Sequence, residues 1–151
     1  MIYRTSVGLD VHARSIAAAA LDHLTGEVAQ RSFAYDPAAV AAWVLSLEGQ
    51  ARCVYEIGTT GFGLQRALEG AGIECVVGAV SKMLRPSGDR VKTDKRDAVF
   101  LARMLAVGNV VEVAVPTPGM EAAREDCRED LMRARHLLSK LLLRKGIVYD
   151  C

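Results

Sequence analysis

Four acidic residues stand among apolar neighbours and have the clearest capacity for chemistry in this chain. Asp10 lies at the end of the apolar run that starts at Ser6, and Glu56 lies near the end of the run from Ala51 to Ile57. Asp94 and Asp97 are three residues apart in a segment with helical periodicity. Because burying an unpaired carboxylate is costly, we expect a partner that neutralises Asp10. We interpret the four acids as one site built around the first strand.

Carboxylates are hard oxygen donors, which suit Mg²⁺ or Mn²⁺ and not zinc. Two such ions about 4 Å apart can activate a nucleophile and stabilise the leaving oxygen in phosphodiester chemistry. Two acids at strand ends followed by a pair of acids on one helix therefore predict a two-ion site. For Asp94 and Asp97 a structural explanation also stands, because acids in a first helical turn are favoured by the helix dipole.

Basic residues collect from Lys82 to Arg103, a segment that contains seven Lys or Arg residues and only three Asp residues. A patch of this kind beside a metal site would hold a phosphate backbone. The alternative is a solvated run of charges without a partner. The candidate nucleic-acid contacts are Lys82, Arg85, Arg90, Lys92, Lys95 and Arg96.

The elements that must position these residues predict an α/β fold with a mixed sheet. Three strands are expected over 2–10, 15–21 and 27–34, although the alanines at 17–20 favour a helix by propensity alone. The span of 15–21 is too short for an independent helix, and 22–26 is typical of a hairpin turn. A helix over 37–47, capped by Asp36, leads to a strand over 51–57. A helix with a stripe at Leu64, Ala67, Leu68 and Ala71 and a strand over 73–77 follow.

A long loop is expected over 78–93, and loops of this length inside compact domains are commonly functional. Thr93 is a candidate cap for a helix over 94–107. At 100° per residue the two acids share a side with Ala98, Leu101 and Leu105, whereas Lys95, Arg96 and Arg103 point elsewhere. We therefore expect the acids to face inward and the bases outward.

Residues 110–115 are expected to form a short strand or an extended link before a long helix over 117–145. Its first turns are acidic and its last turns basic, which matches the helix dipole. Apolar residues recur in steps of four and three, which is typical of a coiled-coil seam. Packing of the helix onto its own domain is the alternative. The seam residues are Cys127, Leu131, Ala134, Leu138 and Leu141.

The whole chain has an ordinary globular composition: 151 residues, 51% of them hydrophobic and 25% charged, with a formal net charge of +1. The first residues do not form a signal peptide, and no uncharged apolar run is long enough for a membrane span. We therefore expect a cytoplasmic protein without a membrane partner. The four cysteines lack zinc-ligand and disulfide-framework spacing, so free thiols are expected.

Three motifs carry a resemblance that extends over nearly the whole chain. They are GLDVH at 8–12, YEIGTTG at 55–61 and KTDKRDA at 92–98. Together they resemble the N-terminal domain of the bacterial DEDD insertion-sequence transposases, the group that includes Piv-type DNA invertases. The resemblance implies a RuvC-like domain with the RNase H-like fold, in which Asp10, Glu56, Asp94 and Asp97 are the catalytic, metal-binding tetrad.

The resemblance further implies a DNA recombinase that is guided by a structured RNA from its own element and assembled through a coiled coil. We expect a RuvC-like catalytic domain over 1–115 and a long coiled-coil linker helix over 116–151, with homo-oligomers formed through 117–145. In the family a second domain follows and contributes a catalytic serine. The chain ends before such a domain, so we expect an isolated catalytic domain, either a truncated fragment or the product of a remnant gene.

Two other functions fit parts of the sequence. One is a nucleic-acid-binding and assembly module without catalysis, which the basic loop, the seam helix and the expected absence of a second domain favour. The other is an actin-like or sugar-kinase ATPase, but Val11 to Arg14 is not the glycine-rich phosphate turn expected after the first acid. His12 is a general base by position or a hydrogen-bonded structural histidine.

Overall fold

A mixed five-stranded sheet forms the centre of the fold. The computed structural model describes residues 2–79 and 94–147. The sheet order is β3-β2-β1-β4-β5, with β2 antiparallel to both β1 and β3, and with β4 parallel to both β1 and β5. This is the α/β arrangement predicted for the RNase H-like fold. The strands are β1 (Thr5–Val11), β2 (Ser15–Asp22), β3 (Val28–Ala34), β4 (Ala51–Glu56) and β5 (Glu74–Gly78).

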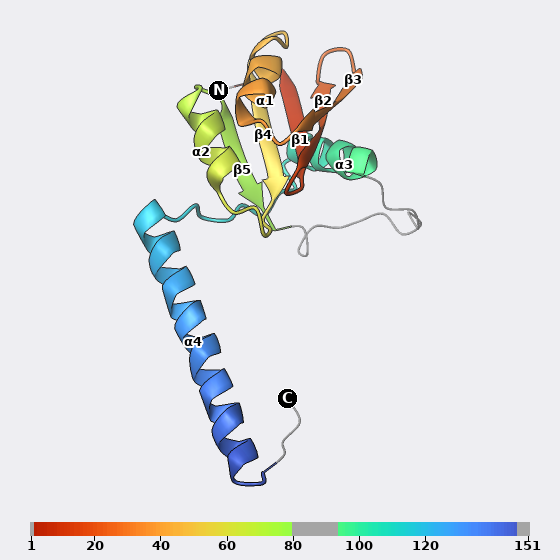
Figure 1. The fold of residues 1–151 in the computed structure, drawn as a ribbon. Helices are drawn as coiled ribbons and strands as arrows, with labels where there is room; N and C mark the ends of the chain where they lie inside the picture. The colour runs from red at the N-terminus through yellow and green to blue at the C-terminus, as the bar shows by residue number, and fades with distance from the viewer. Residues whose placement is uncertain (1, 80–93, 148–151) are drawn as a thin grey trace. The chain divides into compact units, whose positions relative to one another are not determined.

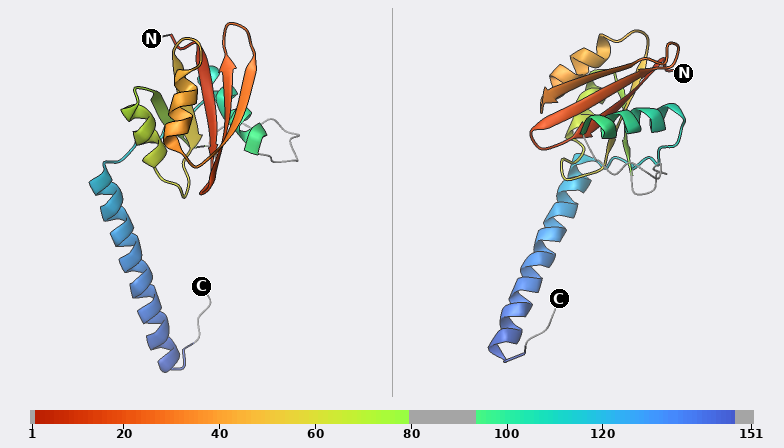
Figure 2. Two further views of the ribbon diagram at one scale, coloured as in Figure 1. Left: turned by 45° about the horizontal axis from the view of Figure 1, so that its top comes forward. Right: turned by 90° about the vertical axis from the view of Figure 1, so that its right-hand side faces the viewer.

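Helices cover both faces of this sheet. Helices α1 (Pro37–Leu45) and α2 (Gly63–Gly70) lie on one face, and α3 (Asp94–Ala106) lies on the other, across β1, β2 and β4 (Figures 1 and 2). The chain divides into two compact units, Met1–Ala114 and Val115–Cys151. The sheet and α1 to α3 belong to the first unit, and α4 (Pro118–Arg144) belongs to the second.

The α3 side of the sheet is built from small residues, which let the helix approach the strands closely. Ala17 and Ala19 of β2 pack against Ala98 of α3. At Gly8 of β1 a Cβ atom would lie only 2.0 Å from the carbonyl oxygen of Ala98. The alanine run therefore forms a strand, as predicted, because its small side chains fit beneath a tightly packed helix.

Some boundaries and faces differ from those expected. Helix α1 ends at Leu45 instead of Leu47. Beyond Leu45 the α-helical hydrogen bonds give way to a tighter turn, in which the Leu47 amide donates to the carbonyl oxygen of Val44, three residues earlier. In α2, Leu64 and Leu68 are buried, but Ala67 and Ala71 are exposed, so the predicted four-residue stripe is wrong for its alanines. The helix has only eight residues, and the buried side chain of Phe62 precedes it.

The segment between α3 and α4 is an extended link that touches the edge of the sheet. Gly78 and Glu112 form an isolated antiparallel bridge, and the Val113 amide donates to the carbonyl oxygen of Val77 over 2.7 Å. Arg52 of β4 donates to Glu112 Oε1 over 2.8 Å. Of the two forms expected for residues 110–115, the link is the observed one.

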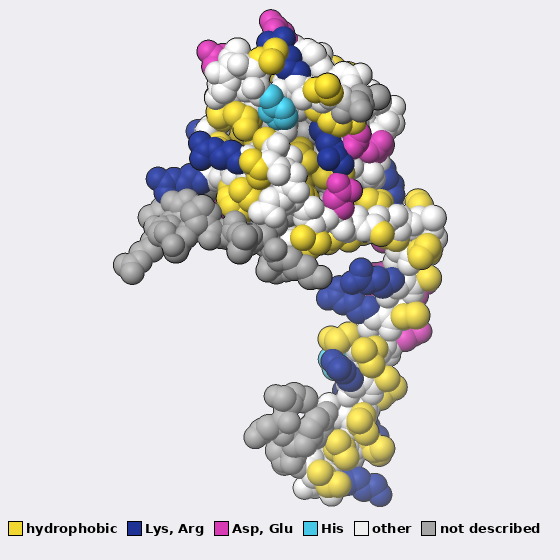
Figure 3. Space-filling model, turned by 180° about the vertical axis from the view of Figure 1, so that it is seen from behind, with side chains coloured by type: hydrophobic (Ala, Val, Ile, Leu, Met, Phe, Trp, Pro, Cys, Tyr) yellow, Lys and Arg dark blue, Asp and Glu magenta, His cyan; other side chains and the backbone are white. Residues whose placement is uncertain are grey.

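Helix α4 is long and carries exposed apolar residues along its length (Figure 3). Thr117 caps it by accepting a hydrogen bond from the Met120 amide, and Pro118 occupies the first turn, where its missing N–H costs nothing. Leu131, Leu138 and Leu141 are each more than half exposed. Among the described residues, no helix is both long and apolar enough to cross a membrane.

Candidate functional site

Two of the four predicted acids lie at the carboxyl ends of neighbouring strands. Leu9 of β1 pairs with Tyr55 of β4 in the parallel register, so Asp10 and Glu56 come next to each other at the same edge of the sheet. Successive side chains along a strand point to opposite faces of the sheet, so Asp10 lies on the same face as Gly8, and Glu56 lies on the same face as Val54. That is the face on which α3 packs, because Gly8 lies against Ala98 and Val54 clusters with Leu101.

The other two acids occupy the first turn of α3. Asp97 is partly buried beside the buried Ala98, whereas the Asp94 side chain is 64% exposed. The expectation that both acids face inward is therefore wrong for Asp94. Asp94 is the first residue of α3 and lies near the point where β1 ends, so the sheet covers it less than it covers Ala98.

Asp10 and Asp94 converge on His12, which directly follows β1. His12 Nε2 lies 3.1 Å from Asp10 Oδ2 and 3.5 Å from Asp94 Oδ1. One potential ligand atom from each of these three residues lies within 4.8 Å of the other two. Within residues 2–79 and 94–147, this is the group of side chains found at metal-ligand spacing, and it does not include Glu56 or Asp97.

The electrostatics of this edge favour binding of a cation. Burial raises the pKa of Asp10, the carboxylates of Asp94 and Asp97 raise it further, and the hydrogen bond with His12 lowers it. The first cause is the loss of water around the charge, and the second is repulsion between like charges. A divalent cation would relieve both effects, and the oxygen-rich donor set fits one.

Tyr55 holds the strand end that carries Glu56. Its side chain is fully buried, its hydroxyl donates to the carbonyl oxygen of Gly61 over 3.0 Å, and it accepts from the Gln65 amide. Burial raises the pKa of this phenol, so it stays protonated and remains a donor. The turn after Glu56 and the start of α2 are thereby tied to β4.

The predicted basic residues divide into two groups. Lys95 and Arg96 are exposed in the first turn of α3. A hollow of about 430 Å³ lies beside Lys95, between α3 and the strands β2 and β3. Its lining residues are Ser15, Ile16, Ala17, Ser32, Asp94 and Lys95. Lys82, Arg85, Arg90, Lys92 and the expected cap Thr93 lie outside the described residues.

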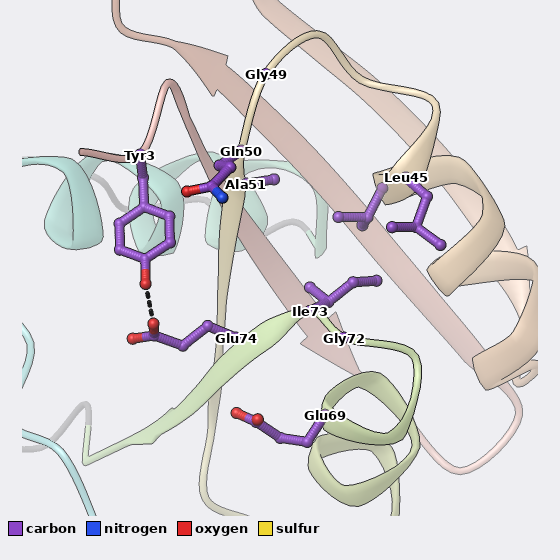
Figure 4. Close-up of a pocket in the computed structure, with 10 residues that line it drawn as sticks. Tyr3, Leu45, Gly49, Gln50, Ala51, Glu69, Gly72, Ile73 and Glu74 are labelled. Atoms are coloured by element: carbon purple, nitrogen blue, oxygen red, sulfur yellow. Dashed lines mark hydrogen bonds between the residues drawn. The ribbon is translucent and has the colours of Figure 1, made fainter. Parts of the chain in front are cut away.

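A second hollow, of about 440 Å³, lies at the opposite end of the parallel strands (Figure 4). Its acidic side chains already have partners within the chain. Tyr3 donates a hydrogen bond to Glu74, and Glu69 Oε1 accepts from the Cys75 amide over 2.9 Å. These contacts tie α2 and the N-terminal segment to β5. The Asp10 edge therefore remains the better candidate for chemistry.

Two residues of the site had weak signals in the sequence. His12 is separated from Asp10 by one residue, which places both on one face of an extended chain, but its contact with Asp94 depends on where α3 lies. Gly8 sets the distance between α3 and β1, and a glycine inside a strand is a known sign of close backbone approach. The described cysteines, Cys53, Cys75 and Cys127, are free thiols as expected.

Comparison with known proteins identifies the group to which this chain is related. A family model for transposases, the DEDD family of the IS110 type, matches residues 7–143. The transposase for insertion sequence element IS1533 of Leptospira borgpetersenii is 34% identical over 152 residues, which is 93% of this chain and 44% of that protein. A candidate transposase of Sinorhizobium fredii, y4qE, is 42% identical over 101 residues, which is 63% of this chain and 26% of that protein. The chain thus spans less than half the length of these relatives, and it belongs to the IS110-type DEDD transposase family.

Proposed function

We propose that this chain is the metal-dependent catalytic domain of a transposase that cleaves and joins DNA phosphodiesters. The observation that carries the proposal is the approach of Asp10, at the end of β1, to Asp94, in the first turn of α3, at metal-ligand spacing. Glu56 ends the neighbouring strand β4, and Asp97 lies in the same helical turn as Asp94, which supports including them in the proposed site. In this proposal the four acids are the catalytic residues and hold two Mg²⁺ or Mn²⁺ ions. When bound, such ions activate the attacking oxygen and stabilise the leaving oxygen.

The protein's own residues supply the positioning for this chemistry. The pKa of Asp10 is raised mainly by burial and to a smaller extent by the nearby carboxylates of Asp94 and Asp97. Lys95 and Arg96, with Lys82, Arg85, Arg90 and Lys92, are proposed to contact the phosphate backbone, which fixes the DNA without reading its sequence. We also propose a structured RNA as the partner that selects the DNA, as the resemblance of the three sequence motifs implies.

Titration calorimetry with Mn²⁺ on the 151-residue chain tests the metal site. Asp10→Asn keeps the shape of the side chain and removes one ligand charge, so we expect at least about a tenfold loss of affinity, which corresponds to about 1.4 kcal/mol. Asp126→Asn, on the exposed surface of α4, is the matched control and should bind as the wild type does. The Asp10 variant should unfold at the same temperature or higher, because it removes a charge whose partial burial is unfavourable when no ion is bound. Equal Mn²⁺ affinities in a folded Asp10→Asn variant and the wild type would refute the site.

A nucleic-acid-binding and assembly module without catalysis is the second candidate. The exposed Lys95 and Arg96 and the exposed leucines of α4 favour it. Gel shifts with DNA and RNA in EDTA separate the two functions. A binding module should bind both DNA and RNA without metal. It should also fail to cleave DNA when Mg²⁺ or Mn²⁺ is added.

A further inference from the structure

We infer that His12 is a metal ligand, so that the proposed ion is held by an imidazole nitrogen together with the carboxylates of Asp10 and Asp94. This inference rests on the proposed metal site and adds a fifth side chain to it. His12 Nε2 faces two carboxylate oxygens at once, at 3.1 Å and 3.5 Å. An octahedral ion with ligands at about 2.1 Å places adjacent ligand atoms about 3 Å apart. The two separations are therefore close to those of neighbouring ligands around one ion.

A hydrogen bond from Nε2 can be directed at only one of the two carboxylate oxygens, although both lie close to it. If Nε2 carries a hydrogen, that single N–H can align with only one acceptor. If Nε2 carries no hydrogen, its lone pair faces two negatively charged oxygens. A cation among the three atoms satisfies all of them together. Imidazole nitrogen and carboxylate oxygen are both common ligands of first-row transition metals.

The backbone fixes His12 independently of the two acids. Its amide donates to the carbonyl oxygen of Ser15 over 2.9 Å, which closes the turn between β1 and β2. The residue follows β1 directly, two positions after Asp10, so the strand sets the direction of both side chains. The His12 side chain is 51% exposed, which leaves it accessible to an ion from solvent. Asp94 reaches the same point from α3, so the ion would join the hairpin to the helix.

A nitrogen ligand has a consequence for metal choice. Mg²⁺ strongly prefers oxygen ligands, whereas Mn²⁺ also accepts imidazole. His12 should therefore raise the affinity for Mn²⁺ more than the affinity for Mg²⁺. This makes it a residue that determines metal specificity in the proposed site.

The test combines calorimetry with pulsed electron paramagnetic resonance of bound Mn²⁺ on the 151-residue chain. Wild-type protein should show a ¹⁴N coupling from a directly bound imidazole. His12→Gln, which keeps a polar side chain but has no imidazole, should lose that coupling. It should also bind Mn²⁺ about tenfold more weakly, with a smaller change for Mg²⁺. His136→Ala, on the exposed surface of α4, is the control and should retain both the coupling and the affinity.

The outcomes separate this inference from the function on which it rests. If Asp10→Asn abolishes Mn²⁺ binding but wild-type protein shows no ¹⁴N coupling, the site stands and His12 is not a ligand. If His12→Gln weakens binding although no coupling is present in the wild type, His12 only positions the carboxylates and the ligand assignment is wrong. If Asp10→Asn binds Mn²⁺ as the wild type does, the proposed function itself fails.

Discussion

Single carboxylates in this domain have opposite roles depending on their neighbours. Asp10 is partly buried and lies near Asp94 and Asp97; burial first, and the nearby negative charges second, disfavour its charged form and raise its pKa. Asp22, at the end of β2, accepts hydrogen bonds from the amides of Leu24 and Thr25 and pairs with Arg4. These donors favour its charged form. We propose that the first acid binds a cation, whereas the second stabilises a turn.

Asp22 should make the stability of the domain depend on pH. The amide of Leu24 and the guanidinium of Arg4 lower the pKa of Asp22 below its ordinary value. Because the folded pKa lies below the unfolded one, the stabilisation is complete above the unfolded pKa and is lost as the pH falls through the folded pKa. Wild-type protein should therefore exceed Asp22→Asn in stability at neutral pH, and the gap should close towards about pH 3.

Urea unfolding followed by circular dichroism across this pH range measures the gap directly. The comparison with Asp22→Asn cancels the titration of all other acids that the two proteins share. Asp126→Asn, on exposed α4, should track the wild type throughout. If the difference in unfolding free energy stays constant down to the lowest pH, the pKa of Asp22 does not change on folding and the prediction is wrong.

The sequence could predict which residue types belong to the site, but not all of their contacts. Acids at strand ends and in a helix turn are visible in the sequence because each interrupts an apolar pattern. The contact of His12 with Asp94 depends on the β1–β2 turn and on the placement of α3, which are tertiary features. Asp94 is more exposed than predicted for the same reason, since helical periodicity gives the direction of a side chain and not where the sheet ends.

At the scale of elements, the distance between α3 and β1 controls the site. Leu101 and Leu105 of α3 pack with Val54, and Ala98 packs on the alanines of β2. These contacts hold the first turn of α3 beside the end of β1. The arrangement requires no side chain at Gly8, where an added Cβ would also lie 2.5 Å from the Ala102 nitrogen.

Gly8→Ala should therefore both destabilise the domain and weaken metal binding. The methyl group must push α3 away from β1, and overpacking of this kind costs about 1–3 kcal/mol. A shifted α3 moves Asp94 and Asp97 away from Asp10, so Mn²⁺ affinity should fall as well. Urea unfolding and titration calorimetry measure the two effects.

Gly70→Ala is the control for this substitution. A Cβ at Gly70, in the last turn of α2, meets no atom within 4 Å. Alanine is also the better helix former, so this variant should match or slightly exceed the wild type in stability. If Gly8→Ala keeps wild-type stability and Mn²⁺ affinity, close packing of α3 on Gly8 does not hold the site together.

The order of the elements could largely be predicted from local patterns. Hydrophobic runs, an Asp-Pro cap and glycine turns predict where strands and helices lie, and the observed ends lie within three residues of the predicted ones, with the largest difference at the start of β1. The alanine strand required a tertiary argument, because its propensity favours a helix and only the packing of α3 explains its composition. The α2 stripe failed because periodicity does not reveal how little of a short helix contacts the sheet.

At the scale of the whole molecule, the two units differ in how they are stabilised. The first has a buried core on both faces of its sheet. The second contains α4, in which no residue is buried. Ion pairs within one or two turns, such as Arg133 with Glu129 and Asp130, stabilise such a helix only slightly. Exposed leucines along a helix of this kind are typical of a surface that packs against another helix, and we propose this role for α4.

We expect α4 to self-associate through its seam, so that the chain forms oligomers. Leu131 and Leu138 occupy equivalent seam positions one heptad apart and are 54% and 51% exposed. Replacing both with lysine places charges in the proposed interface, and these charges would lose their hydration when the helices pair. Analytical ultracentrifugation should then show a concentration-dependent oligomer for the wild type and a monomer for the double variant.

Two further measurements define this interface. His136→Lys, on the side of α4 away from the seam, adds charge without entering the interface and should leave the oligomer unchanged.

In a Cys151→Ser background, Cys127 is the exposed thiol among the described cysteines, whereas burial raises the pKa of Cys53 to about 12 and keeps it unreactive. A parallel, in-register pair would bring two Cys127 residues together, so mild oxidation should crosslink it through them. An antiparallel pair would associate without this crosslink, and a wild-type protein that sediments as a monomer at all concentrations would show that the seam does not pair copies of this chain.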